Sequence, residues 1–296
     1  MQRNDGSSSV IANLVAPLFV LLWSTGFIGA KFGLPYSEPL TFLSIRFGLV
    51  LGLMLLWVLA SKAAWPSMEQ ARALFVVGAL LHGVYLGGVF SAIWLGLEAG
   101  LAALIVCMQP ILSAVLARWM LDEQMTRVQW FGLFVGLVGA VLVVSRKLGD
   151  GVGDWGGLGL CVAGLFGISI ATIYQKKHCA DAPMRSGAVL QYSGALALVV
   201  PLAFIFETRE VVWSGEFVFA LAWLVFVLSL GAVGLLMNLI QRGEASKVAS
   251  LFFLVPPCTA IMAWAMFGET LGWLAIVGVA LTAAGVAMVM RGGIKN

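Results

Sequence analysis

Ten long runs of apolar residues divide this chain and decide what it can fold into. Breaks at charged residues, prolines and Gly/Ser clusters place the runs near residues 12–32, 40–60, 72–94, 99–120, 128–145, 156–174, 187–206, 217–238, 247–267 and 271–290. A helix needs roughly 20 apolar residues to cross the hydrocarbon core of a bilayer. The sequence therefore predicts an all-α membrane protein of ten transmembrane helices.

Composition argues against a water-soluble or β-barrel alternative. Of the residues, 61% are hydrophobic and 10% are charged, whereas a soluble domain carries roughly 25% charged residues. Membrane-spanning β-strands would show alternating segments of roughly 10 residues, and runs such as LVAPLFVLLW do not alternate. Because the connecting loops are short, we expect one compact membrane domain whose first apolar run is an uncleaved helix.

Loop charges predict an orientation with both termini in the cytoplasm. Of the 17 Lys and Arg residues, Arg46 falls inside a predicted span. With a cytoplasmic N-terminus, the outer loops receive only Lys31, Arg146, Lys147 and Arg209, which leaves twelve (17 − 1 − 4) on the inside. Such a bias toward cytoplasmic loops sets membrane topology. The basic residues are too scattered for a nucleic-acid interface, so we expect none.

The two halves of the chain resemble each other in sequence. The stretch GLAALIVCMQPILSAVLARWMLDE (100–123) lies over 245–269 at an offset of about 146, so that Pro110 meets Pro256 and the closing glutamates coincide. Glycines of the following spans continue the match. A constant offset through several spans indicates an internal repeat rather than the general likeness of apolar segments.

The repeat predicts an inverted architecture. Residues 1–148 and 149–296 each hold five predicted spans, and an odd number makes the second half enter the membrane in the opposite orientation. Inverted repeats are a recurring design of secondary transporters, in which the substrate site lies near the bilayer midplane between the halves. We therefore expect two inverted five-helix repeats around a central site.

Several motifs link the chain to a known family. They are LLWSTGFIGAKF in the first span, FLSIRF in the second, and ALIVCMQPILSAVLARWMLDE followed by GLFVGLVGAVLVV, with an echo in VASLFFLVPPCTAIMAWAMFGETL and GVALTAAGVAMV. With these motifs the chain resembles the drug/metabolite transporter superfamily, specifically its ten-helix EamA-type exporters. The resemblance implies a bacterial inner-membrane exporter of metabolites such as amino acids. It also implies a cavity lined by spans one to four and six to nine, with spans five and ten at the periphery.

Arg46 is the strongest single candidate for a functional residue. A guanidinium inside a span costs about 3 kcal/mol or more unless it faces protein, water or a partner. One interpretation is that Arg46 contacts a carboxylate or another anionic group of the cargo. The other is a structural arginine bonded to backbone carbonyls near the membrane edge. Sequence alone leaves both interpretations open.

Further candidates are polar or aromatic residues within the spans. His82 and Tyr85 lie three residues apart on one helix face, where His82 is a candidate proton carrier or a neutral hydrogen-bonding residue. Proline inside a helix frees a backbone carbonyl and bends the chain. Pro110, Pro256 and Pro257 thus predict kinked helices at the cavity, with a gating role or a static one. The predicted substrate-binding set is completed by Trp23, Ser24, Gln109, Gln191, Tyr192 and Asn238.

Motifs that the chain lacks narrow the mechanism. It has no GxxxxGK[ST] loop for ATP and no Cys/His cluster, so we expect neither a cofactor nor a metal. No Asp or Glu lies inside a predicted span, which favours neutral, zwitterionic or anionic cargo, carried by proton antiport or by facilitated diffusion. The alternatives are an intramembrane hydrolase using Ser169 and His82, and a drug-efflux protein for neutral or cationic toxicants. A monomer and a homodimer are both compatible with the sequence.

Overall fold

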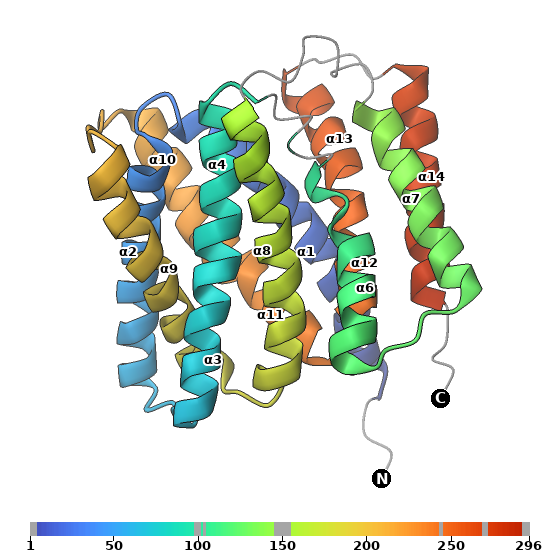
Figure 1. The fold of residues 1–296 in the computed structure, drawn as a ribbon, viewed down its shortest axis with the longest axis horizontal. Helices are drawn as coiled ribbons and strands as arrows, with labels where there is room; N and C mark the ends of the chain where they lie inside the picture. The colour runs from blue at the N-terminus through green and yellow to red at the C-terminus, as the bar shows by residue number, and fades with distance from the viewer. Residues whose placement is uncertain are drawn as a thin grey trace.

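The computed structural model is a bundle of long helices that stand side by side with similar axis directions (Figure 1). It describes residues 5–97, 102, 105–144, 155–242, 245–267 and 272–291. Extended structure in these residues amounts to an isolated bridge between Ser37 and Val211. The predicted boundary at 148/149 falls outside the described residues.

The described helices correspond to the ten predicted spans. The first half contains α1 (Asp5–Gly33), α2 (Pro39–Ala60), the continuous series α3 (Met68–Gly78), η1 (Ala79–Leu86) and α4 (Gly87–Trp94), then α6 (Gln109–Leu121) and α7 (Arg127–Val144). The second half contains α8 (Trp155–Cys179), α9 (Met184–Phe206), the series α10 (Gly215–Trp223), η3 (Leu224–Ala232) and α11 (Val233–Arg242), the series α12 (Ala245–Ser250), η4 (Leu251–Leu254) and α13 (Val255–Phe267), and α14 (Trp273–Arg291).

Length and hydropathy agree with this assignment. Among the described helices, six are long and apolar enough to cross a membrane. Shorter apolar helices cover Val15–Gly26, Arg127–Leu142 and Val248–Thr259. The all-α membrane fold predicted from the sequence is confirmed.

The two halves run in opposite directions through the bundle. Helix α1 begins at the lower edge in Figure 1, and successive spans alternate until α7 ends at the upper edge. Helix α8 then begins at the upper edge, and α14 ends at the lower edge, where α1 began. Five spans in each half therefore produce the inverted arrangement that the sequence predicted.

Helices α7 and α14 pack against each other at one side of the bundle, away from its centre (Figure 1). A Cβ atom added at Gly285 would lie 2.6 Å from the carbonyl oxygen of Gly132. The small residues therefore let the two backbones approach closely, as in other membrane helix pairs. Spans five and ten thus occupy the peripheral position that the family resemblance implied.

Two spans change their helical hydrogen-bonding pattern at corresponding places. The third span is π-helical over η1 and the eighth over η3, and the starts of the two segments differ by 145 residues (224 − 79), close to the repeat offset. Wide π turns are rare and are frequently found at functional sites. No pattern in the sequence predicted these segments.

The proline-containing spans are interrupted rather than smoothly bent. Helix α6 restarts at Gln109 after a turn, with Pro110 in its first turn. Helix α13 restarts at Val255 after the 3₁₀ segment η4, with Pro256 and Pro257 in its first turn. Proline suits a first turn because it has no backbone N–H to leave unpaired. The interruptions lie near each other in the bundle, since the Cys107 thiol approaches the carbonyl oxygen of Phe252 at 4.0 Å.

Hydrogen bonds join two loops at the upper edge of the bundle. The Glu207 carboxylate accepts from the backbone N–H groups of Leu40 (2.7 Å) and Thr41 (2.6 Å) and from the Thr41 hydroxyl (2.7 Å). It therefore caps the positive end of α2. The backbone N–H of Val212 donates to the carbonyl of Tyr36, whose hydroxyl donates to the Glu216 carboxylate.

The Glu38 carboxylate adds a further set of bonds at this edge. It accepts from the backbone N–H and the hydroxyl of Thr208, each at 2.7 Å, and from the backbone N–H of Arg209 at 3.0 Å. The α1–α2 loop and the α9–α10 loop are consequently fastened to each other. We call these two loops, residues 34–38 and 207–214, the upper clamp.

The upper clamp yields a stability prediction. Glu207→Gln leaves one acceptor oxygen where two now accept, so we expect the free energy of unfolding to fall by about 1–3 kcal/mol. Thermal unfolding of the purified protein in detergent should show a lower Tm. Glu210→Gln, a change at an exposed residue of the same loop, should leave the Tm unchanged. If the two variants had the same Tm, the role of Glu207 in joining the two loops would be contradicted.

Candidate functional site

Arg46 lies inside the protein core. It stands seven residues (46 − 39) beyond the start of α2, about 10 Å along the helix axis, and its side chain is 0% exposed. The Nε–H donates to the Ser229 hydroxyl at 3.0 Å, while Nη1 has no partner. Among the described residues, no carboxylate and no backbone carbonyl bonds this guanidinium. Arg46 therefore presents a buried, unsatisfied cationic donor.

The π-helical segments bring the neighbours of Arg46 into place. Ser229 belongs to η3, and its carbonyl oxygen accepts a hydrogen bond from the Tyr192 hydroxyl of α9 at 3.1 Å. His82 of η1 stacks on Tyr192 with ring centroids 4.6 Å apart and planes 12° from parallel. Phe47, next to Arg46, packs on both rings. Four elements, α2, α9, η1 and η3, thus meet around the guanidinium.

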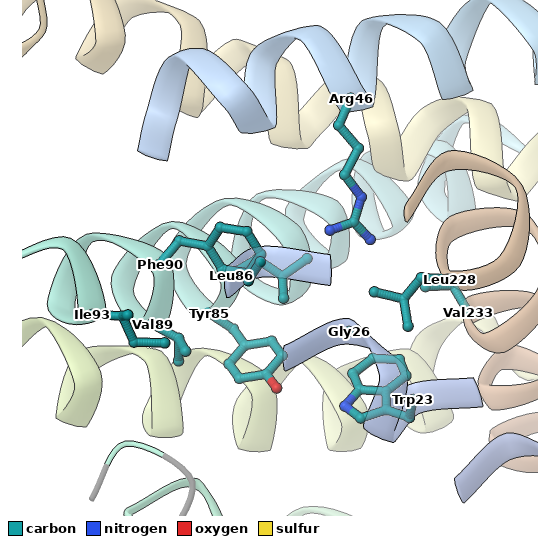
Figure 2. Close-up of a pocket in the computed structure, with 11 residues that line it drawn as sticks. Trp23, Gly26, Arg46, Tyr85, Leu86, Val89, Phe90, Ile93, Leu228 and Val233 are labelled. Carbon is teal, nitrogen blue, oxygen red and sulfur yellow. The ribbon is translucent and has the colours of Figure 1, made fainter. Parts of the chain in front are cut away.

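A small pocket adjoins Arg46 on one side (Figure 2). Its volume is about 20 Å³, enough for a single water molecule. Trp23 and Tyr85 have ring planes within 7° of parallel, and in Figure 2 the guanidinium reaches from α2 toward the side that these rings occupy. The other lining residues are Gly26, Ala30, Leu86, Val89, Phe90, Ile93, Leu228 and Val233. We call this cavity the inner pocket.

A larger cavity of about 500 Å³ approaches the same point from the lower edge of the bundle. Its walls come from the early part of α1, the end of α2, the start of α9, and η3 with α11, and it reaches Tyr192 and Ser229. We call it the vestibule. This volume falls in the range of small-molecule sites. Because Ser229 lines the vestibule and bonds Arg46, and Arg46 lines the inner pocket, the guanidinium lies where the two cavities meet.

The vestibule has a single charged residue among its described lining residues. This residue is Arg185, and its guanidinium lies over the Trp57 ring at 4.8 Å from the centroid. The vestibule lies between the middle and the lower edge of the bundle, whereas the upper clamp fastens the loops at the upper edge.

Five predicted site residues line the two cavities, and four do not. The lining residues are Trp23, Arg46, Tyr85, Tyr192 and Asn238. His82 lies behind Tyr192, and the Ser24 hydroxyl is bonded to the Val20 carbonyl of its own helix at 2.7 Å. Gln109 donates to the Ser113 hydroxyl (3.2 Å) and Gln191 to the Gln175 side-chain oxygen (3.3 Å), so both amides contact neighbouring protein groups.

Sequence reasoning did not single out Ser229 or Arg185. Ser229 is the only polar residue of LVFVLSLGA (224–232), which is a weak signal because hydroxyls within spans commonly bond their own helix. Arg185 was counted only as a loop charge that sets topology. Both become site residues through the packing of α9 and η3 against α2.

The geometry does not support the hydrolase alternative. The Ser169 hydroxyl is fully buried and donates to the carbonyl oxygen of Leu165 in its own helix at 2.7 Å. No hydrogen bond joins it to His82 in the described part of the chain, and neither residue is among the lining of the cavities above. A serine nucleophile needs a base within hydrogen-bonding reach and access for substrate.

Comparison with known proteins agrees with the architecture. The family model of the EamA-like transporter family matches residues 10–145 and again 155–291, so it covers both halves. The chain belongs to the EamA-like transporter family. It is thus a multi-pass membrane protein of a transporter family, and the family model matches each of its two halves.

Relatives of this EamA-like transporter cover nearly its whole length. It is 27% identical to the transporter YvbV of Bacillus subtilis over 93% of this chain and 90% of that protein. Proteins named probable amino-acid metabolite efflux pumps are 25% identical in Salmonella typhimurium and 24% in Escherichia coli, each over 97% of this chain and 94% of the relative. A crystal structure with 19% identity has a TM-score of 0.78 over 94% of this chain and 96% of that one, and it shares the fold.

Proposed function

We propose that this EamA-like transporter exports small metabolites that carry a carboxylate, namely amino acids and related zwitterionic or anionic compounds, across the bacterial inner membrane. The observation that carries the proposal is Arg46, a buried guanidinium with an unpaired Nη1 where the inner pocket and the vestibule meet. A buried charge of this kind needs a partner, and a cargo carboxylate supplies one. The names of the Salmonella and Escherichia relatives support the same class.

Alternating access is the proposed mechanism. With both termini cytoplasmic, as the loop charges predict, the vestibule faces the cytoplasm and loads cargo there, while the upper clamp closes the outer side. Outward opening then requires the halves 1–148 and 149–296 to rock about the Arg46 site. The interrupted helices at Pro110 and at Pro256 and Pro257 are the proposed points of bending, because their backbone ladders are already broken.

The absence of acidic lining residues disfavours cationic drugs as cargo. The charged residues among the described lining of the two cavities are Arg46 and Arg185, both positive. A cationic toxicant would lie beside a buried positive charge without a counterion, which is costly at low dielectric. Metabolites bearing a carboxylate fit this electrostatic environment better.

A flux screen tests the proposal. Purified protein in liposomes would be screened for counterflow of radiolabelled amino acids and organic acids, with and without a pH gradient. We expect flux for some carboxylate-bearing compounds, and stimulation by the gradient would indicate proton coupling. Absence of flux for every member of the panel, with an active cationic or neutral drug, would overturn the proposed class.

Cysteine accessibility tests the proposed orientation. Asn238 is half-buried in the vestibule wall, so Asn238→Cys should react with a membrane-impermeant maleimide in inside-out vesicles and not in intact cells. Glu210→Cys, in the exposed part of the upper clamp, should show the reverse pattern. The same sidedness for both cysteines would contradict the proposed orientation.

A further inference from the structure

The charged residues among the described lining of the inner pocket and the vestibule are both positive. Arg46 is the only charged residue among the described residues that line the inner pocket, and Arg185 is the only one in the vestibule. They lie on consecutive parts of one route, Arg185 at the start of α9 near the lower edge and Arg46 at the inner end. This arrangement attracts anions along the route and offers a cation no counterion.

The two acceptor atoms of Ser229, which lies beside Arg46, already accept hydrogen bonds. The Ser229 hydroxyl oxygen accepts from Arg46 Nε, and the Ser229 carbonyl oxygen accepts from the Tyr192 hydroxyl. An ammonium group has three donors and no acceptor, so it needs several free oxygens or a carboxylate around it. The described lining of the inner pocket instead supplies an unpaired donor, the Nη1 of Arg46, with the hydroxyl of Tyr85 and no carboxylate beside it. The unpaired Oε1 of Gln191 belongs to a residue that lines neither cavity.

We infer that the cargo is a small apolar carboxylate bound as a net anion, with a hydroxyl, oxo or acylated nitrogen where an amino acid has its ammonium group. This inference rests on the proposed function and narrows it. In an α-amino acid the ammonium group sits on the carbon next to the carboxylate, so pairing that carboxylate with Arg46 brings a second positive charge close to the guanidinium. Replacing the ammonium by a hydroxyl removes this repulsion and keeps the carboxylate contact.

The rest of the inner pocket matches an apolar side chain. Apart from Arg46, its lining is aliphatic, aromatic or glycine, and the Trp23 and Tyr85 rings form one wall (Figure 2). Because the pocket now holds about 20 Å³, a cargo side chain must displace Leu228 or rearrange η1 and η3 to enter it. The π turns of these segments give them room to adjust.

A set of four isosteric ligands tests the inference. Leucine carries both an ammonium and a carboxylate, 2-hydroxy-4-methylpentanoate the carboxylate alone, leucinol the ammonium alone, and 4-methylpentane-1,2-diol neither group. Binding to the full-length protein in detergent at neutral pH would be measured by calorimetry and by thermal shift. A second set built on phenylalanine and 3-phenyllactate covers a larger side chain. We expect each hydroxy acid to bind at least about tenfold more tightly than its amino acid.

Arg46→Gln serves as the matched variant, and it should remove the preference for the carboxylate. Equal or tighter binding of leucine or phenylalanine would overturn the inference and leave the exporter function standing. Tighter binding of leucinol than of the hydroxy acid, or no binding in either set, would also overturn it. The flux screen described above decides the proposed function separately, because that screen includes amino acids and acids of other sizes.

Discussion

Arg46→Gln is expected to lower the transport rate of carboxylate-bearing cargo by about 100-fold or more without unfolding the protein. Truncating one partner of a buried hydrogen-bonded charge pair costs about 2–5 kcal/mol, which corresponds to roughly 30-fold to several-thousand-fold in affinity. In the described structure no protein carboxylate forms a hydrogen bond with the guanidinium. No negative charge of the protein therefore compensates for its burial. An uncompensated buried charge is destabilising, so we expect its removal not to lower the free energy of unfolding.

This combination separates the two interpretations that the sequence left open. If Arg46 binds cargo, flux falls while the Tm of the ligand-free protein stays constant or rises. A structural arginine predicts the opposite, a lower Tm with flux that falls only as folded protein is lost. Counterflow in liposomes and thermal unfolding in detergent would be measured on the same preparations. Arg72→Gln, at an exposed position of α3, is the matched control and should change neither quantity.

The bilayer explains why the fold was predictable. Each span must satisfy its backbone hydrogen bonds internally, so apolar runs of spanning length specify helices with little ambiguity. Odd numbers of spans in matching halves then require inversion, as α7 and α8 show at the upper edge of Figure 1. Arg46 could be identified as a candidate functional residue for the same reason. A single charged residue within an apolar run is easily recognised in the sequence.

The site was only partly predictable, because it depends on which face each helix turns toward the centre. Gln109 and Ser229 are both polar residues within apolar spans, yet Gln109 bonds its own helix and Ser229 bonds Arg46. The difference arises from η3, where π turns rotate the following residues relative to an α-helix. Nothing in LVFVLSLGA distinguishes a π segment from an α-helix, since the hydrogen-bonding register depends on packing against α2 and α1.

The crossing of α3 and α9 supplies the second prediction, in which Gly194→Val prevents stable folding. A Cβ atom added at Gly194 would lie 2.0 Å from the carbonyl oxygen of Phe75, and one added at Gly78 would lie 1.8 Å from that of Gln191. Both contacts are with backbone, which cannot swing aside as a side chain does. The helices would have to separate, and overpacking of this kind costs about 3 kcal/mol or more once the backbone moves.

Separation of α3 and α9 would also displace residues of the candidate site, because the crossing lies next to the residues that surround Arg46. Tyr192 is two residues from Gly194 on α9, and His82 follows Gly78 by one turn, so their stacking depends on this close approach. We expect Gly194→Val to give little monodisperse protein and a much lower Tm in detergent. Gly52→Val is the matched control, because a Cβ atom there meets nothing within 4 Å and Gly52 lies on the exposed side of α2. Similar yields and Tm values for the two variants would show that the α3–α9 crossing tolerates a wider spacing, and that the position of Tyr192 does not depend on it.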